Sequence, residues 1–334
     1  MALAKDELST KAMGGSELMK YELAKRIDPE LFDQFQIYVS RVQEPRDPNK
    51  IAIYWHQDLP EDPHSVEPLK NGGWKNFDML VFNSYWQQTA YQKAFNIPYW
   101  KCVTLCNAII PFEDHVKPDP KEKVNIIYHT TPHRGLELLV PVFEKLYEQD
   151  QNIELDVYSS FSMYGWSERD APYQGLFDRC KQHPGINYHG YQKNDVIREA
   201  LKKAHIYAYP SIWTESSCIS LMEAMSASVL CVHSSLGALW DTSGQLTRMY
   251  QFDEDPNVHA ARFMDILKVS IDDMRNNQHI QEEVTFTRFY ANVRFNWDRR
   301  EREWKSLMTS LVNAKQAGQL KNREEPKDRF VYRV

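Results

Sequence analysis

The chain has 334 residues, of which 42% are hydrophobic and 26% charged, and this length favours two folded domains. A formal net charge of −6 argues against nucleic acid as a main partner. No apolar run approaches the roughly 18 residues that a membrane-spanning helix needs, and the polar N-terminus does not read as a signal peptide. Five scattered cysteines without a metal-binding partner set favour a reduced, cytoplasmic protein.

Strands alternate with helices along most of the chain, which is typical of an α/β fold. In the first half the pattern predicts a helix after a glycine turn (13–27), strands (35–41, 50–58, 78–84 and 102–110) and a second helix (85–95). The segment 111–123 carries three prolines and alternating charges, which suits a linker between domains.

The alternation restarts after this linker. The second half is predicted to contain strands (124–130, 153–159, 186–191, 205–211 and 229–235) and helices (134–149, 196–204, from about 217, 257–274 and 295–314). Two α/β halves imply a cleft between them, and ligands of such sheets bind at the carboxyl ends of the strands.

The stretch YPSIWTESSCISLMEA (209–224) places two glutamates around a predicted helix start at such a strand end. Ser216 or Ser217 suits the N-cap, and the backbone N–H groups of Cys218 and Ile219 would then be free to bind phosphate. Carboxylates accept hydrogen bonds from hydroxyl groups, so Glu215 in the loop could hold a sugar and Glu223 in the helix a ribose diol. A sugar, a diphosphate and a ribose in that order describe a nucleotide sugar.

This stretch resembles the Glu-x7-Glu motif of retaining GT-B glycosyltransferases, in particular glycosyltransferase family 4 (group 1). Other segments agree with the resemblance: GGSE (14–17), LCNAIIPF (105–112), YHTTPHRGLELLVPVF (128–143), HGYQKNDVIREALKKAHIYAYPS (189–211), SSLGALWDTSG (234–244) and FNWDRREREW (295–304). Together these motifs cover most of residues 12–312.

The resemblance implies two Rossmann-like α/β domains that face each other across a cleft. It gives an acceptor domain (1–118), a nucleotide-sugar domain (119–296), a terminal helix that crosses back to the first domain (297–318) and a tail (319–334). It implies a metal-independent, retaining hexosyltransferase that needs no cofactor and moves a sugar from a nucleotide-diphosphate donor to a hydroxyl of a carbohydrate or other acceptor. The oligomeric state stays open.

The resemblance also assigns roles to residues of this chain. The catalytic set is His56, Arg134 and Glu215, and Asp58 is the acceptor residue. The donor-binding set is Gly14, Gly15, Asn107, Arg134, Tyr191, Ser216, Ser217, Cys218, Ile219, Glu223 and Gly237. Structural roles compete with several of these assignments: His56 as a hydrogen-bonded core histidine, Asp58 as a turn cap, Tyr191 as a packing residue, Arg134 as a solvated side chain at a helix start, and Gly14-Gly15 as a plain helix entry.

The chain departs from the family pattern at several places. Ala108 replaces a glycine, and Trp240-Asp241 replaces Pro-Glu. The family pattern has two phosphate-binding cations, an arginine and a lysine. Arg134 stands at the lysine position, whereas His129 and Thr130 stand where the arginine is expected. The N-terminal sheet lacks its usual first strand, or the chain is a shortened form.

Two other functions compete with transfer: a nucleotide-sugar-binding module with little turnover, and a GT-B-fold epimerase. The first 118 residues carry 13 Lys/Arg and 16 Asp/Glu, which favours an acceptor in solution over an anionic lipid and leaves peripheral membrane contact open.

Overall fold

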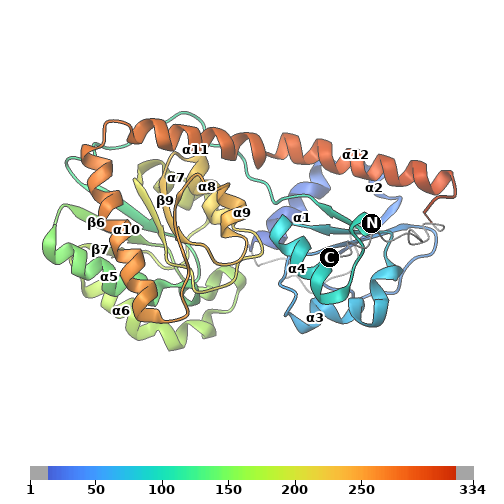
Figure 1. Ribbon diagram of the computed structural model, residues 1–334, viewed down its shortest axis with the longest axis horizontal. Coiled ribbons are helices and arrows are strands. Elements are labelled where there is room, and N and C mark those ends of the chain that lie inside the picture. Colours follow the sequence, from blue (N-terminus) through green and yellow to red (C-terminus); the bar gives the residue numbers. More distant parts are fainter. Residues whose placement is uncertain (1–13, 321–334) are drawn as a thin grey trace, which may run out of the picture.

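The computed structural model describes residues 14–320, and the segment expected to lack a strand (1–13) lies outside them. The described residues form two α/β domains, each built around one parallel sheet, which confirms the predicted GT-B architecture of two Rossmann-like halves (Figure 1).

The N-terminal domain has a four-stranded parallel sheet in the order β1-β2-β3-β4. Its strands are β1 (Phe35–Val39), β2 (Ile51–Trp55), β3 (Met79–Phe82) and β4 (Cys102–Thr104). Its helices are α1 (Gly15–Arg26), α2 (Pro29–Phe32), α3 (Pro63–Val66), η1 (Glu67–Asn76), α4 (Tyr85–Phe95) and η2 (Tyr99–Lys101). Every residue of β1 and β2 is buried, as expected for parallel strands that are covered on both faces.

The C-terminal domain has a six-stranded parallel sheet in the order β10-β9-β8-β5-β6-β7. Its strands are β5 (Val124–Tyr128), β6 (Ile153–Val157), β7 (Ile186–Tyr188), β8 (Ile206–Tyr209), β9 (Leu230–Ser234) and β10 (Arg248–Tyr250). Its helical elements are η3 (Pro132–Arg134), α5 (Leu136–Gln149), η4 (Phe161–Tyr164), η5 (Ser167–Tyr173), α6 (Gln174–Gln182), α7 (Asn194–Lys203), α8 (Ile219–Ser226), α9 (Leu239–Ser243), α10 (Pro256–Asn276) and α11 (Ile280–Arg294).

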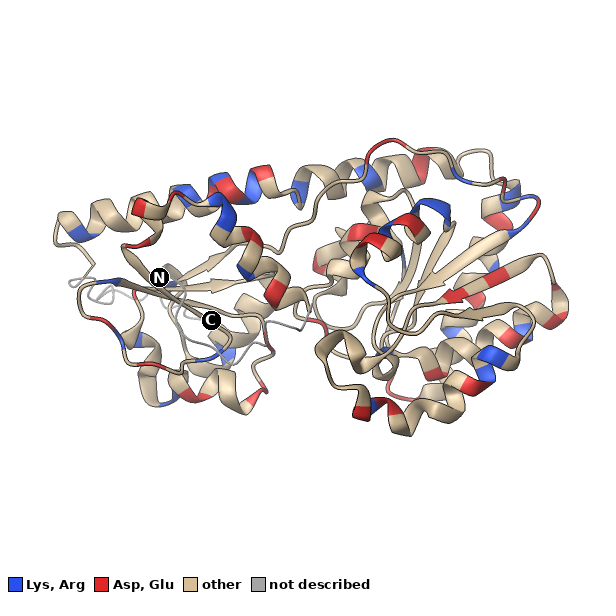
Figure 2. Cartoon of the chain, turned by 180° about the vertical axis from the view of Figure 1, so that it is seen from behind, with Lys and Arg blue, Asp and Glu red and all other residues tan. Residues whose placement is uncertain are grey.

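The last helix, α12 (Trp297–Gln316), leaves the C-terminal domain and packs on the N-terminal one (Figure 1). Trp304 is fully buried there, and its ring meets the ring of Trp55 on β2 edge-on at 5.0 Å. Trp297, Met308 and Leu311 join the same core. The N-terminal domain is therefore completed by a helix from the other end of the chain. Acidic and basic residues are interspersed along this helix (Figure 2).

Several elements differ from the sequence expectations. α8 begins at Ile219 with Cys218 as its N-cap, later than the serines that were expected to cap it. β4 ends at Thr104, so the residues after it run as a connection without strand pairing, apart from a single bridge between Ile109 and Asn296. α11, β10 and the helical segment after β6 were not predicted. No helix within the described residues has the length and apolarity to cross a membrane.

Candidate active site between the two domains

Two adjoining depressions lie where the carboxyl ends of both sheets face each other. The first, here called the Glu223 pocket, is lined by Gly15, Leu18, His129, Thr130, Tyr158, Ser160, Met163, Gly190, Tyr191, Gln192, Asn194, Ile197, Ile219, Ser220 and Glu223. The second, the Glu215 cleft, is lined from both domains and includes Glu17, Arg41, Asp58 and Asn107 on one side and Arg134, Trp166, Arg169, Trp213 and Glu215 on the other. Ile219 and Ser220 line both depressions.

Glu223 is held in place by two side chains of α7. Asn194 Nδ2 and Arg198 Nη1 both donate to its Oε1, at 3.3 and 3.2 Å. Oε2 has no protein donor among the described residues, so it is available to a ligand. Burial raises the pKa of Glu223, and the charge of Arg198 opposes that shift.

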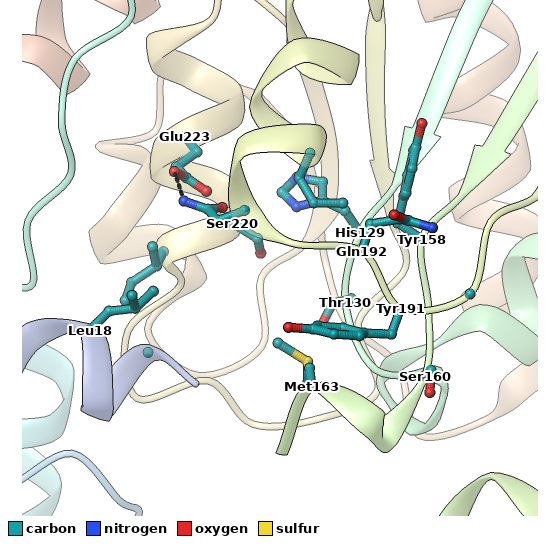
Figure 3. Close-up of a pocket in the computed structure, with 15 residues that line it drawn as sticks. Leu18, His129, Thr130, Tyr158, Ser160, Met163, Tyr191, Gln192, Ser220 and Glu223 are labelled. Atoms are coloured by element: carbon teal, nitrogen blue, oxygen red, sulfur yellow. Dashed lines mark hydrogen bonds between the residues drawn. The ribbon is translucent and has the colours of Figure 1, made fainter. Parts of the chain in front are cut away.

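Aromatic and apolar side chains form part of the remaining walls of the Glu223 pocket, beside polar ones such as Thr130, Ser160 and Ser220 (Figure 3). The Tyr191 ring reaches into the pocket beside Met163, and Leu18 of α1 approaches from the other domain. Tyr158 stacks on His189 with ring centroids 4.3 Å apart. An aromatic ring, apolar side chains and one free carboxylate oxygen suit a nucleoside, whose base stacks and whose ribose donates hydrogen bonds.

The start of α8 lies between the two carboxylates because a tight contact fixes the loop before it. Gly237 has φ +62° and forms a parallel bridge with Glu215, and a Cβ at Gly237 would stand 2.6 Å from the Glu215 carbonyl oxygen. Cys218 gives no side-chain cap, so the first N–H groups of α8 are open to a ligand at the junction of the two depressions.

Glu215 itself is buried and paired. Its Oε1 accepts hydrogen bonds from Arg134 Nη1 and from the Tyr209 hydroxyl. Arg134 reaches it because Gly135, at φ +127°, packs so closely on the β8 loop that a Cβ would lie 2.1 Å from the Pro210 carbonyl oxygen. Glu215 and Arg134, predicted for the sugar and the diphosphate separately, therefore form one ion pair.

Ser216 contacts the other domain. Its hydroxyl donates to the Gln57 carbonyl at 2.9 Å, and the Ser84 hydroxyl donates to the Ser216 carbonyl at 2.6 Å. Asn83 Nδ2 adds a bond to Ser216 Oγ at 3.3 Å. The loop that carries Glu215 is thus held by residues that follow β2 and β3.

Most of the residues predicted for the site lie together here. Eleven of them line one or both depressions: Gly15, Asp58, Asn107, Arg134, Tyr191, Glu215, Ser216, Ser217, Cys218, Ile219 and Glu223. Asp58 is engaged by Arg41 at 2.5 Å. Gly14 and Gly237 line neither depression: a Cβ on Gly14 would meet the Tyr164 ring at 2.8 Å, so both glycines allow close packing beside the site.

His56 differs from the expectation. It is fully buried, lines neither depression, and lies against the rings of Tyr54, Phe82 and Tyr91. Burial lowers its pKa to about 3, and neither ring nitrogen has a hydrogen-bond partner among the described residues. In this structure it packs as a core histidine, because its ring is enclosed by these aromatic side chains; the next two residues, Gln57 and Asp58, line the cleft instead.

Several residues at the site were missed from the sequence. Asn194 and Arg198 are four residues apart on one helix, and this spacing of polar groups on an amphipathic helix could have marked them. Tyr158, Ser160, Trp166 and Arg169 gave no such signal, because the segment that carries most of them is irregular and folds as short 3-10 turns.

Solved structures of other proteins share this fold. A glycosyltransferase from Rickettsia africae matches with a TM-score of 0.67 and 12% identity over 92% of this chain and 84% of its own. HepE of Anabaena in complex with UDP-glucose matches with a TM-score of 0.58 and 13% identity, over 78% of this chain and 72% of its own. Sucrose-phosphate synthase from Thermosynechococcus elongatus matches with a TM-score of 0.60 and 15% identity, over 80% of this chain and 69% of its own.

At these identities the likeness concerns the fold, and no curated protein matches the chain in sequence. The family model described as "Glycosyl transferases group 1" matches residues 110–277, half of the chain, and includes the two glutamates, Arg134 and the start of α8. The chain belongs to the group 1 glycosyltransferase family.

Proposed function

We propose that the protein transfers a sugar from a nucleotide-diphosphate donor to an acceptor hydroxyl with retention of anomeric configuration and without a metal ion. The observation that carries this proposal is the order of groups along the two depressions. Glu223, the open start of α8 and Glu215 follow one another, and Ile219 and Ser220 line both sides of the junction. A ribose, a diphosphate and a sugar would occupy these places in turn.

Each group has a defined task in this proposal. Oε2 of Glu223 accepts hydrogen bonds from the ribose diol, and Tyr191 packs on the base. The N–H groups at the start of α8 bind the diphosphate, and Arg134 adds positive charge as the leaving group gains negative charge. These groups replace the potential that a divalent cation supplies in other transferases, which is why no metal is proposed.

Glu215 and the opposite wall complete the reaction. Glu215 accepts hydrogen bonds from the donor sugar and stabilises the ring as positive charge develops on it. The acceptor enters from the N-terminal wall, where Asp58 and Asn107 offer hydrogen-bonding groups. The acceptor hydroxyl attacks on the face that the phosphate leaves, forms the new C–O bond, and passes its proton to the departing phosphate oxygen. No nucleophilic side chain is required.

Binding and turnover test this proposal in sequence. A thermal-shift screen of UDP, GDP, ADP and their glucose conjugates should show at least one nucleotide that stabilises the protein, by about 2.7 kcal/mol at a hundred times its Kd. The bound nucleotide sugar is then supplied with candidate acceptors, and release of the nucleoside diphosphate and the product anomer are measured. Release that depends on acceptor and gives the donor's anomer supports the proposal. Binding of the nucleotide sugar without release of the nucleoside diphosphate would favour a binding module. Interconversion of the donor sugar would favour an epimerase.

A further inference from the structure

Within residues 14–320, almost every arginine forms an ion pair with a carboxylate. Of the fifteen arginines within the described residues, only Arg169 and Arg302 form no ion pair. Arg302 lies on α12, away from both depressions, whereas Arg169 lines the Glu215 cleft.

The other two arginines of the cleft are already engaged. Arg41 pairs with Asp58 and Asp62, at 2.5 and 3.3 Å, and Arg134 pairs with Glu215. Among the described residues of the cleft, Arg169 is therefore the one arginine whose guanidinium forms no ion pair with a carboxylate. Burial lowers the pKa of His133 to about 4, and the positive charges of Arg134 and Arg169 add to this shift. Both arginines therefore act on the same wall of the cleft.

Arg169 is also held in position. Its guanidinium carbon lies 4.3 Å from the centroid of the Trp166 ring, and its backbone N–H donates to the Trp166 carbonyl at 3.0 Å. The next residue, Asp170, fixes the segment by accepting from Ser160 Oγ at 2.5 Å and from the Phe161 N–H at 2.8 Å. The N–H donors of the Arg169 side chain are thus confined to one part of the Glu215 cleft.

The surface beside Arg169 suits a sugar ring. Trp166 and Trp213, which also line the cleft, are 44% and 43% exposed, and indole rings offer an apolar face to the C–H groups of a sugar. A cation next to such a face favours a ligand that combines a sugar with a negative charge.

We propose that Arg169 and Trp166 form an anion-binding subsite of the Glu215 cleft, which takes a phosphate or carboxylate group carried by a sugar. This rests on the proposed glycosyl transfer. The anion has two sources within that reaction: a phosphate of the donor, or an acidic group on the acceptor. In either case the subsite is separate from the Arg134–Glu215 pair.

The test uses Arg169→Gln, Arg169→Lys and the matched control Arg302→Gln, which removes the other unpaired arginine. The affinities of the full-length proteins for UDP, GDP and ADP are measured by calorimetry. With the bound nucleotide at saturation, affinities for glucose 6-phosphate and glucuronate are then measured, with glucose as the uncharged reference. A charge-assisted hydrogen bond is worth about tenfold to a hundredfold in affinity.

Loss of this size for the nucleotide in Arg169→Gln supports the subsite with the donor as the source of the anion. Unchanged nucleotide affinity with loss for an acidic sugar, but not for glucose, supports it with the acceptor as the source. In both cases Arg169→Lys should recover part of the affinity. The proposal is overturned if Arg169→Gln matches wild type in both arms, or if Arg302→Gln shows the same losses. A wild-type protein that binds no nucleotide would instead contradict the proposed function.

Discussion

Asp241 of the C-terminal domain caps a helix of the N-terminal domain: its Oδ2 accepts the backbone N–H of Tyr85 at 2.7 Å. The N–H of Trp86 also points to this oxygen, at 3.3 Å, and Arg294 Nη2 lies 3.4 Å from Oδ1. A buried carboxylate at the start of α4 is favoured by the partial positive charge of the helix end. Since Ser84, the N-cap of α4, bonds to the loop of Glu215, this contact links the domain interface to the site.

Asp241→Asn should therefore loosen the domain interface. We expect a loss of about 1–2 kcal/mol in unfolding free energy and weaker nucleotide-sugar binding, because the charge that holds α4 is removed. The matched control is Asp255→Asn, which alters the cap of α10 within one domain. Calorimetric affinity and denaturant unfolding measure both variants. If the two lose donor affinity equally, the contact across the domains has no special role.

Glu215→Gln separates the sugar role of Glu215 from its ion pair. The change keeps the size of the side chain but removes the charge that faces Arg134 and, in our proposal, the developing positive charge on the sugar. Turnover should fall at least tenfold, about 1.4 kcal/mol. Affinity for the nucleoside diphosphate should not fall, since Arg134 loses its internal partner and stays available. A diphosphate affinity that drops as far as turnover would place Glu215 on the phosphate side.

Arg198→Gln should change how nucleotide binding depends on pH. Burial raises the pKa of Glu223, and Arg198 is the cation that opposes this shift. The ribose diol needs the ionised carboxylate, so affinity declines as pH falls through the raised pKa, and without Arg198 the decline begins at a higher pH. Calorimetric titrations with the nucleoside diphosphate across about pH 5–8 would measure this. An equal loss at every pH would indicate only a packing defect.

The fold could be predicted from the sequence because its signals are local. Buried strands such as IAIYW and helices such as YWQQTAYQKAF carry their pattern within a few residues, and β2 and α4 lie where the pattern put them. The loop with Glu215 was also recognisable, since a strand, a proline and a helix start follow one another in the chain.

What could not be predicted depends on contacts between distant residues. The pairing of Arg134 with Glu215 joins positions 81 residues apart, and it arises from the close approach that Gly135 allows. The contact between Asp241 and Tyr85 spans 156 residues and exists only when the domains meet. For His56 the sequence left a catalytic and a core role open, and only the aromatic rings packed around it show that it is buried.

Activity should survive an excess of EDTA. In our proposal Arg134 and the open start of α8 supply the positive potential that the leaving diphosphate needs, so a divalent ion has no required place. Turnover of the bound donor is compared before and after chelation, and again after magnesium or manganese is added. Loss of activity that either ion restores would refute the metal-independent mechanism.

His56→Leu tests whether this histidine serves the core or the reaction. Leucine is apolar and of similar volume, so the variant should fold with a change below about 1.5 kcal/mol and keep its turnover. Burial lowers the pKa of this histidine from its ordinary value of 6.5 to about 3, so the unfolded chain binds one more proton between these values. Stability is therefore lost as pH falls below 6.5, by about 1.4 kcal/mol per pH unit for this residue. Urea unfolding at several pH values should show a shallower loss in His56→Leu. A variant that folds and binds nucleotide normally but has lost its turnover would return His56 to the catalytic set.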